Sequence, residues 1–313
     1  MEDPGKRFRI LTCIDGSEES YRGLRYAARL GSGVDADVTL LYVRAFDSAL
    51  GTGGLDPRLI RENLLDWDLD LPGIRALKAG RDILLEVGLM DEAWISRLYH
   101  SETQGDPLGD NAIEYISDTE TMITLRLKVA SDIVNGILEE CEDGDYTLVI
   151  LGASERWQPG QRKTFWDPAV AEKIVARAPA SVIVARELEQ NHGHLICTNG
   201  SEASISMARK DAILASRCAC PISLLSVAPD EASSDKAQDA LERTRNAIEE
   251  LGVPVMEAFI RVGDLVTEII EAGAVYSVIV VAHSPKAGLR RLFETDTAFQ
   301  IVENARNSVM VIK

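Results

Sequence analysis

Three adjacent residues near the start of the chain, Asp15, Gly16 and Ser17, combine a carboxylate, a flexible backbone and a hydroxyl. They stand in ILTCIDGSEES, where an apolar run ends and polar residues lead into the helical pattern RGLRYAARL. One interpretation is a turn that starts a helix, since Asp and Ser side chains bond free backbone N–H groups. The other is the floor of a nucleotide pocket, where glycine lets a ligand approach the backbone. Both interpretations require a strand before the turn and a helix after it.

The elements that would position these residues occur twice in the chain. Four segments of the first half recur in the second half in the same order: LTCIDGSEES as LICTNGSEAS, VTLLYV as ISLLSV, TLVILGA as SVIVVAH, and ASVIVAR as NSVMVIK. Such ordered self-similarity indicates two copies of one unit. We therefore place a first domain at residues 1–186, a polar linker at 187–193 and a second domain at 194–313.

Each copy alternates short apolar, β-branched runs with amphipathic stretches. Buried runs of four to eight residues separated by helical periods are typical of a parallel sheet with helices on both faces. The sequence therefore predicts an α/β fold with two tandem, doubly wound, parallel five-stranded sheets of Rossmann-like type. Asp132 and Asp264 each follow the third strand of a copy, where we expect them to cap helices.

The first copy is longer because it carries inserts at about residues 48–71 and 90–120. The second insert is rich in acidic residues, and we expect a solvated surface excursion. The alternative is an arm that docks a partner, with apolar anchors at Trp94, Ile95, Leu98 and Tyr99.

Charge limits the partners of the protein. The 313 residues include 50 acidic and 33 basic side chains, and the net charge is −17 at pH 7. Such a surface repels nucleic-acid phosphates and anionic lipid headgroups, so we expect neither as a partner. The sequence has no apolar run of membrane-spanning length and no apolar leader at its start, and we expect a cytoplasmic protein.

Cysteine and histidine are the remaining candidates for chemistry. Cys218 and Cys220 lack a second Cys or His pair at metal-binding spacing, so we expect buried thiols and no metal site. The chain has four histidines, and the nearby pair His192 and His194 lies where the linker meets the first strand of the second domain. No nucleophile elbow, phosphate loop or paired catalytic carboxylate motif is present, so we expect no enzyme and no catalytic residues.

Taken together, these segments resemble a tandem member of the universal stress protein family. The resemblance rests on DGS before a helix, a second strand reading TLLYV, a fourth reading LVILGAS, and the final helix and strand VAEKIVARAPASVIVAR. It implies the adenine-nucleotide alpha-hydrolase-like fold. It also implies that the two domains pair through their last strands, SVIVAR and SVMVIK, as an intramolecular pseudo-dimer, and that two chains could pair further as a homodimer.

The resemblance also implies where a nucleotide would bind. Family members that bind ATP carry Gly, two residues, Gly, nine residues, then Gly followed by Ser or Thr after the fourth strand. Here Glu155 takes the second glycine place and Pro168-Ala169 the final pair, while in the second copy Asn199 replaces the Asp and Ala282 the first glycine. ATP or AMP is therefore a possible ligand of the first domain alone. The candidate pocket residues are Asp15, Gly16, Ser17, Val43, Gly152 and Ala153.

Three functions follow from these observations. The first is a non-catalytic stress-response or regulatory role through contacts with an unidentified protein, with degenerate nucleotide sites. The second is an adenine-nucleotide sensor or weak ATPase that uses the first domain. The third is an accessory subunit of a larger enzyme that docks through the acidic insert.

Overall fold

The computed structural model describes seven stretches of the chain, namely residues 7–32, 36–46, 72–103, 106–152, 168–186, 193–282 and 297–313. These residues form two compact units, Met1–Ala180 and Ser181–Lys313. The insert at about 48–71 lies outside the described residues. None of the described helices is long and apolar enough to cross a membrane.

The first unit is built on a mainly parallel sheet in the strand order β6-β1-β2-β5-β4-β3. The strands β6, β1, β2 and β5 are parallel, whereas β4 and β3 run antiparallel to their neighbours. Their bounds are β1 Phe8–Cys13, β2 Ala36–Ala45, β3 Ile95–Thr103, β4 Asp106–Ile116, β5 Met122–Ala130 and β6 Leu148–Gly152.

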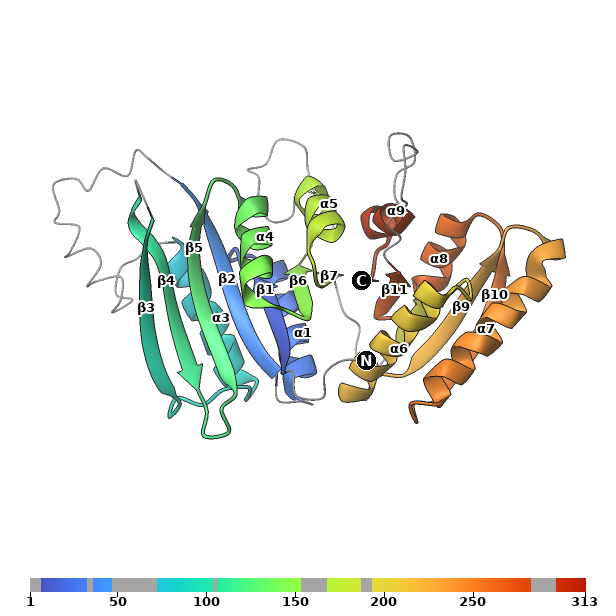
Figure 1. Cartoon of the computed structure of the whole chain (residues 1–313), viewed down its shortest axis with the longest axis horizontal. Helices are drawn as coiled ribbons and strands as arrows, with labels where there is room; N and C mark the ends of the chain where they lie inside the picture. The colour runs from blue at the N-terminus through green and yellow to red at the C-terminus, as the bar shows by residue number, and fades with distance from the viewer. Residues whose placement is uncertain are drawn as a thin grey trace. The chain divides into compact units, whose positions relative to one another are not determined.

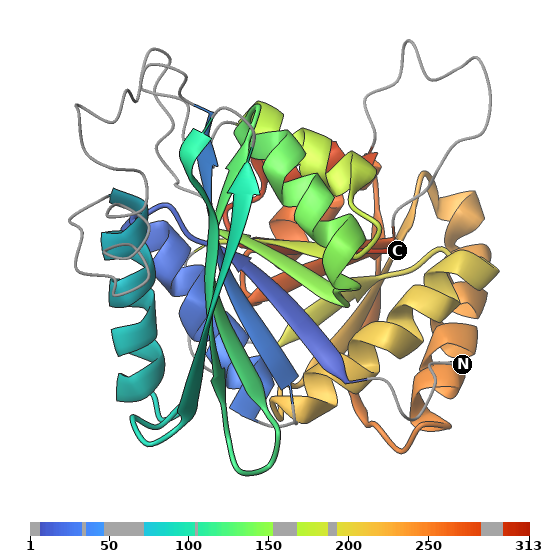
Figure 2. The same ribbon diagram turned by 60° about the vertical axis from the view of Figure 1, so that its left-hand side comes forward.

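Helices cover both faces of this sheet, as Figures 1 and 2 show. One face is covered by α1 and α3, which pack on each other, and the opposite face by α4 and α5. The bounds are α1 Glu18–Ser32, α3 Pro72–Glu86, α4 Ile133–Gly144 and α5 Pro168–Arg177. The central strands are buried on both sides, which explains their almost continuous apolar sequence. The predicted α/β fold is therefore confirmed.

The second unit has the strand order β10-β9-β8-β11-β12-β7. Its strands are β7 Ser181–Ala185, β8 His194–Cys197, β9 Ile222–Ala228, β10 Val255–Val262, β11 Val278–Ala282 and β12 Ser308–Ile312. The strands β8 to β12 are parallel, as the sequence predicts. The helices of this unit are α6 Glu202–Arg217, α7 Ser234–Glu249, α8 Leu265–Gly273 and α9 Thr297–Asn304, with a short 3₁₀ turn at Glu231–Ser233. Among these helices, α6 packs on α7, and α8 packs on α9.

The strand β7 contains the segment SVIVA, which closes the first sequence copy. It pairs antiparallel with β12, with Val184 opposite Val309 and Val182 opposite Val311. This pairing accounts for the unit boundary at Ala180, just before β7. The boundary that we placed at residue 186, between the two repeated sequence copies, stays a prediction.

The acidic insert is not the solvated excursion that we expected from the sequence. It forms the hairpin of β3 and β4, which extends the sheet beyond β5. Two of its acidic residues make specific bonds: Asp110 Oδ1 accepts a hydrogen bond from the Val129 N–H at 2.7 Å, and Asp106 forms an ion pair with Arg44. Ile113 of β4 is buried. The insert is therefore part of the sheet.

The predicted helix caps are present in both units. The Oδ1 atom of Asp132 accepts a hydrogen bond from the Asn135 N–H at 2.9 Å at the start of α4. Asp264 does the same for the Thr267 N–H at 3.0 Å at the start of α8. Each carboxylate thus satisfies a backbone donor that has no partner within its helix.

Candidate functional site

The candidate pocket lies where the parallel strands β6, β1 and β2 end. Because these strands are neighbours, their carboxyl ends meet at one edge of the sheet. The chain leaves β1 into α1 on one face, and it reaches β6 from α4 on the other face. Ligands of open α/β sheets bind at such a reversal of winding. The residues after β1 therefore stand at the position best suited to a ligand.

Asp15, Gly16 and Ser17 form a tight turn at this edge. The Oδ1 atom of Asp15 accepts hydrogen bonds from the Ser17 backbone N–H at 2.9 Å and from the Ser17 hydroxyl at 2.6 Å. Gly16 has a φ of 89°, which L side chains rarely adopt. Ser17 Oγ then accepts from the Ser20 N–H at 3.2 Å in the first turn of α1. The segment is thus a turn that starts a helix, as the first interpretation predicts.

This turn uses only one oxygen of Asp15. The hydrogen bonds from the Ser17 N–H and the Ser17 hydroxyl both end on Oδ1, and within the described part of the chain Oδ2 takes part in neither. The side chain is partly exposed at the edge of the sheet. An ionised carboxylate has spare acceptor capacity beyond two hydrogen bonds. Asp15 can therefore hold the turn and still accept a hydrogen bond from a ligand.

The second unit repeats the turn with a neutral side chain. The Oδ1 atom of Asn199 accepts a hydrogen bond from the Ser201 N–H at 3.0 Å, and Gly200 has a φ of 72°. Ser201 Oγ accepts from the Ser204 N–H at 3.2 Å and so caps α6. Because the amide does the same structural work, the negative charge of Asp15 is not needed for the turn.

The other predicted pocket residues are only partly in place. Val43 near the end of β2 is buried, and its side chain packs against Gly136 of α4. Gly152 ends β6. Ala153 lies outside the described residues, as do the loops 153–167 and 283–296, which contain Glu155 and the basic and aromatic residues near it. Pro168-Ala169 begins α5, and Ala282 ends β11.

Two tyrosines beside the turn were missed in the sequence. The pKa values of Tyr21 and Tyr42 are raised, first by burial and then by the negative charge of Asp15. The Tyr21 hydroxyl donates a hydrogen bond to the Ala76 carbonyl at 3.2 Å, which joins α1 to α3 beside the turn. The Tyr42 ring lies against Gly73 at the start of α3. The carboxylate of Asp15 thus sits beside two protonated phenols, which the spacing of the residues did not indicate.

A buried charged cluster lies beneath α4. The Glu140 carboxylate accepts a hydrogen bond from the Tyr146 hydroxyl at 2.8 Å and lies 3.3 Å from an Arg126 nitrogen and 3.6 Å from Lys128 Nζ. Burial, followed by the charge of Glu140, raises the pKa of Tyr146. Nearby, burial raises the pKa of the Cys13 thiol well above its usual range, which disfavours the nucleophilic thiolate. The cluster therefore joins β5 to α4 and carries no reactive group.

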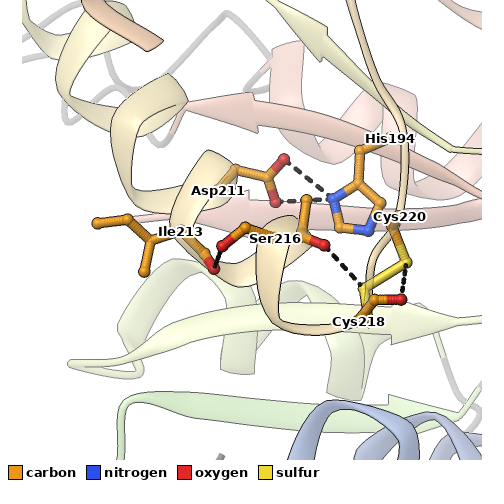
Figure 3. The surroundings of a disulfide bond; sticks show 7 residues. His194, Asp211, Ile213, Ser216, Cys218 and Cys220 are labelled. Atoms are coloured by element: carbon orange, nitrogen blue, oxygen red, sulfur yellow. Dashed lines mark hydrogen bonds and ion pairs between the residues drawn. A yellow bond between two sulfur atoms is a disulfide. The ribbon is translucent and has the colours of Figure 1, made fainter. Parts of the chain in front are cut away.

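The prediction for Cys218 and Cys220 is wrong. The two residues form a disulfide, and they are half-buried at the end of α6. Figure 3 shows His194 beside the two sulfur atoms. The short spacing that marks metal-binding motifs did not connect His194 with the two cysteines, because His194 lies at the start of β8.

Part of the first unit matches a known family. A model described as the universal stress protein family matches residues 6–66. The predicted resemblance to universal stress proteins is confirmed. No curated protein matches the sequence.

Solved universal stress proteins share the fold along most of the chain. A putative universal stress protein of Pseudomonas aeruginosa UCBPP-PA14 is 14% identical, with a TM-score of 0.60, over 97% of this chain and 92% of that one. A universal stress protein of Archaeoglobus fulgidus DSM 4304 is 15% identical, with a TM-score of 0.55, over 97% of this chain and 96% of that one. At such identities the likeness shows the fold alone. Each match extends over almost the full length of both chains, which fits a tandem arrangement.

Proposed function

We propose that this universal-stress-type chain is a non-catalytic regulatory protein that acts by binding another protein along β3. The observation that carries the proposal is the exposure of the large apolar side chains on that strand: Ile95 is 67% exposed, and Leu98 and Tyr99 are each 47% exposed. Large apolar side chains gathered on a surface are a mark of interaction sites. Among the described residues around Asp15, the hydrogen bonds of Asp15 and Ser17 serve the turn and the helix start.

The position of β3 in the sheet defines how a partner would bind. It is the last strand in the order of the first unit, with β4 as its neighbour among the described strands. Residues 95–99 are all exposed, so both faces of the strand are open. An edge strand presents unpaired N–H and C=O groups that can pair with another chain. We infer that the partner adds an extended segment to β3.

The two faces of β3 determine which side chains the partner segment needs. Side chains alternate along a strand, so Ile95 and Tyr99 lie on one face and Leu98 on the other. The register places Tyr99 opposite Ala112 and Leu98 opposite Ile113. A partner segment with apolar side chains at alternating positions would cover both faces. A second copy of this chain is a poor occupant, because two molecules of net charge −17 repel each other.

Site-specific photocrosslinking in cells tests this proposal. A photoreactive amino acid at Tyr99 should crosslink one distinct protein, whereas the same group at Val275, which is 66% exposed in the second unit, should not. The purified partner should then bind wild-type protein and lose at least tenfold in affinity for Leu98→Arg, because an edge charge opposes strand pairing. Equal affinity for both proteins, a crosslink to a second copy of the chain, or the same product from both positions would contradict the proposal. Deleting the hairpin would be a poor test, because it would expose the buried side of β5.

A second candidate function is adenine-nucleotide sensing by the first unit. It is favoured by the spare Oδ2 atom of Asp15 at the reversal of winding between β1 and β6. The comparison of the two turns offers a clean variant, because Asp15→Asn recreates the arrangement that Asn199 already holds. If the first unit binds ATP through Asp15, ATP with Mg²⁺ raises the melting temperature of the wild type and not that of the variant. An unchanged wild-type melting curve at millimolar ATP, or an equal shift in both proteins, would remove this candidate.

A further inference from the structure

Three side chains that bind soft metal ions meet in the second unit. His194 is the first residue of β8, and Cys218 and Cys220 follow the end of α6. One ligand atom from each of the three residues lies within 4.8 Å of the other two. Figure 3 shows the imidazole of His194 between the carboxylate of Asp211 and the two sulfur atoms. Two thiolates and an imidazole are the ligand set of catalytic-type zinc sites that keep a fourth position open.

The orientation of His194 points to a missing ligand. The side chain is 1% exposed, and its Nδ1 atom lies 3.0 Å from both carboxylate oxygens of the fully buried Asp211. A carboxylate accepts hydrogen bonds, so this contact selects the tautomer with the proton on Nδ1, in which Nε2 offers a lone pair. Within the described part of the chain, Nε2 has no hydrogen-bond partner. A buried nitrogen left unpaired is costly, and such groups in native structures need an explanation.

The carboxylate behind the ring strengthens this interpretation. Metal-ligating histidines usually donate their other ring N–H to a carboxylate or carbonyl group, which fixes the tautomer and the orientation of the ring. Asp211 provides this group from α6, and it lies on the side of the ring away from the sulfur atoms. The pair thus holds Nε2 toward Cys218 and Cys220.

The backbone fixes both cysteines beside this nitrogen. The His194 N–H donates a hydrogen bond to the Pro221 carbonyl at 2.8 Å, and the Cys220 N–H donates to the Ala215 carbonyl at 2.9 Å. A Cβ atom at Gly193 would lie 1.9 Å from the Pro221 oxygen, so only glycine allows the start of β8 to approach this turn. The ligands are therefore placed by the regular elements β8, α6 and β9.

We propose that the reduced form of the second unit binds Zn²⁺ through Cys218 Sγ, Cys220 Sγ and His194 Nε2. The disulfide is the metal-free, oxidised form of the same site. A dithiol reductant supplies two electrons and two protons, which convert the disulfide to two thiols, and the reductant becomes a disulfide. Zn²⁺ then displaces both thiol protons and binds two thiolates and one neutral imidazole. The half-buried cysteines leave the fourth position accessible to water or an external ligand.

Metal analysis of the full-length protein tests this site with Zn²⁺ as the probe. Protein reduced by a phosphine and freed of metal should bind about one Zn²⁺ ion per chain, whereas the oxidised protein should bind none. Cys218→Ser and Cys220→Ser should each lose this binding. Co²⁺ in place of Zn²⁺ should give a thiolate-to-metal absorption band in the wild type that both variants lack. This spectrum reports ligation directly, and circular dichroism of the same samples verifies that they are folded.

Two further variants separate ligation from general effects on structure. Cys197→Ser should bind Zn²⁺ as the wild type does, because burial raises the pKa of the Cys197 thiol to about 12 and this residue is outside the cluster. Asp211→Asn should weaken Zn²⁺ binding by about 10- to 100-fold, since it changes the group that positions the ring. The proposal is overturned if the reduced wild type binds no Zn²⁺, if it binds Cu⁺ alone, or if folded Cys218→Ser and Cys220→Ser retain wild-type binding.

Discussion

His194 Nδ1 lies 3.0 Å from both carboxylate oxygens of Asp211, and this pair joins the first residue of β8 to the middle of α6 in the core of the second unit. The pair is a structural contact whether or not a metal binds. A buried polar pair is costly to break, because the residue that remains keeps its buried polar atoms and loses their partner.

Asp211→Ala should therefore lower the free energy of unfolding by about 2–4 kcal/mol. Urea unfolding of the metal-free protein measures this change. The matched control is Arg243→Ala, which removes the exposed ion pairs with Glu202 and Asp239 and should cost at most about 1 kcal/mol. Equal losses in the two variants would show that the buried pair contributes no more than a surface contact.

The packing of α4 on β2 gives a second prediction. A Cβ atom at Gly136 would lie 2.5 Å from Val43 Cγ1 and 2.9 Å from Ala130 Cβ, both of which are buried. Gly136→Ala should therefore destabilise the protein by about 1–3 kcal/mol through overpacking. In α1, Gly31→Ala meets only ordinary contacts of 3.5 Å or more and should be neutral or slightly stabilising. Urea unfolding compares the two variants, and a neutral Gly136→Ala would contradict this packing.

The buried hydroxyl of Tyr146 gives a prediction about pH. Because its pKa is raised in the folded protein, Tyr146 stabilises the fold fully below the unfolded-state pKa of about 10. This contribution is lost as pH rises above about 10, where the unfolded tyrosine ionises first. Tyr146→Phe should cost about 1–2 kcal/mol at pH 8, since it removes the hydrogen bond to Glu140.

The difference in the free energy of unfolding between wild type and Tyr146→Phe should then narrow by about 1 kcal/mol between pH 8 and pH 11. Urea unfolding across this range measures the free energy of unfolding of both proteins. Other tyrosines with raised pKa, such as Tyr21 and Tyr115, lower this free energy equally in both proteins, so their effect cancels in the difference. A difference that stays constant with pH would mean that Tyr146 ionises as easily in the folded state as in the unfolded state.

The repeated strands and the turn at Asp15 could be predicted because their determinants are local. Apolar runs followed by Asp-Gly-Ser or Asn-Gly-Ser specify a strand, a turn and a helix start within a few residues. The hairpin could not be predicted in this way, because the acidic residues of β4 look solvated until their partners are known. Asp106 bonds to Arg44, and Asp110 to the backbone of Val129, both from distant parts of the sequence.

The cluster around His194 was missed for a related reason. Motif searches look for ligands at short, regular spacing, whereas His194 and Cys220 are joined by the parallel pairing of β8 with β9. That register places His194 opposite Ile222, so the starts of the two strands, and Cys220 just before β9, lie side by side. A signal did exist: a histidine opens one strand, and Cys-Ala-Cys-Pro directly precedes the next.

The central claim, that a partner protein adds a strand to β3, is tested most directly by amide hydrogen exchange with the partner that crosslinks at Tyr99. In the free protein, the β3 amides at the open edge should exchange rapidly, and the partner should slow them by about tenfold or more. The strand β10, which ends the strand order of the second unit, should show no change. Slow exchange of β3 in the free protein, or exchange that the bound partner leaves unchanged, would contradict the claim.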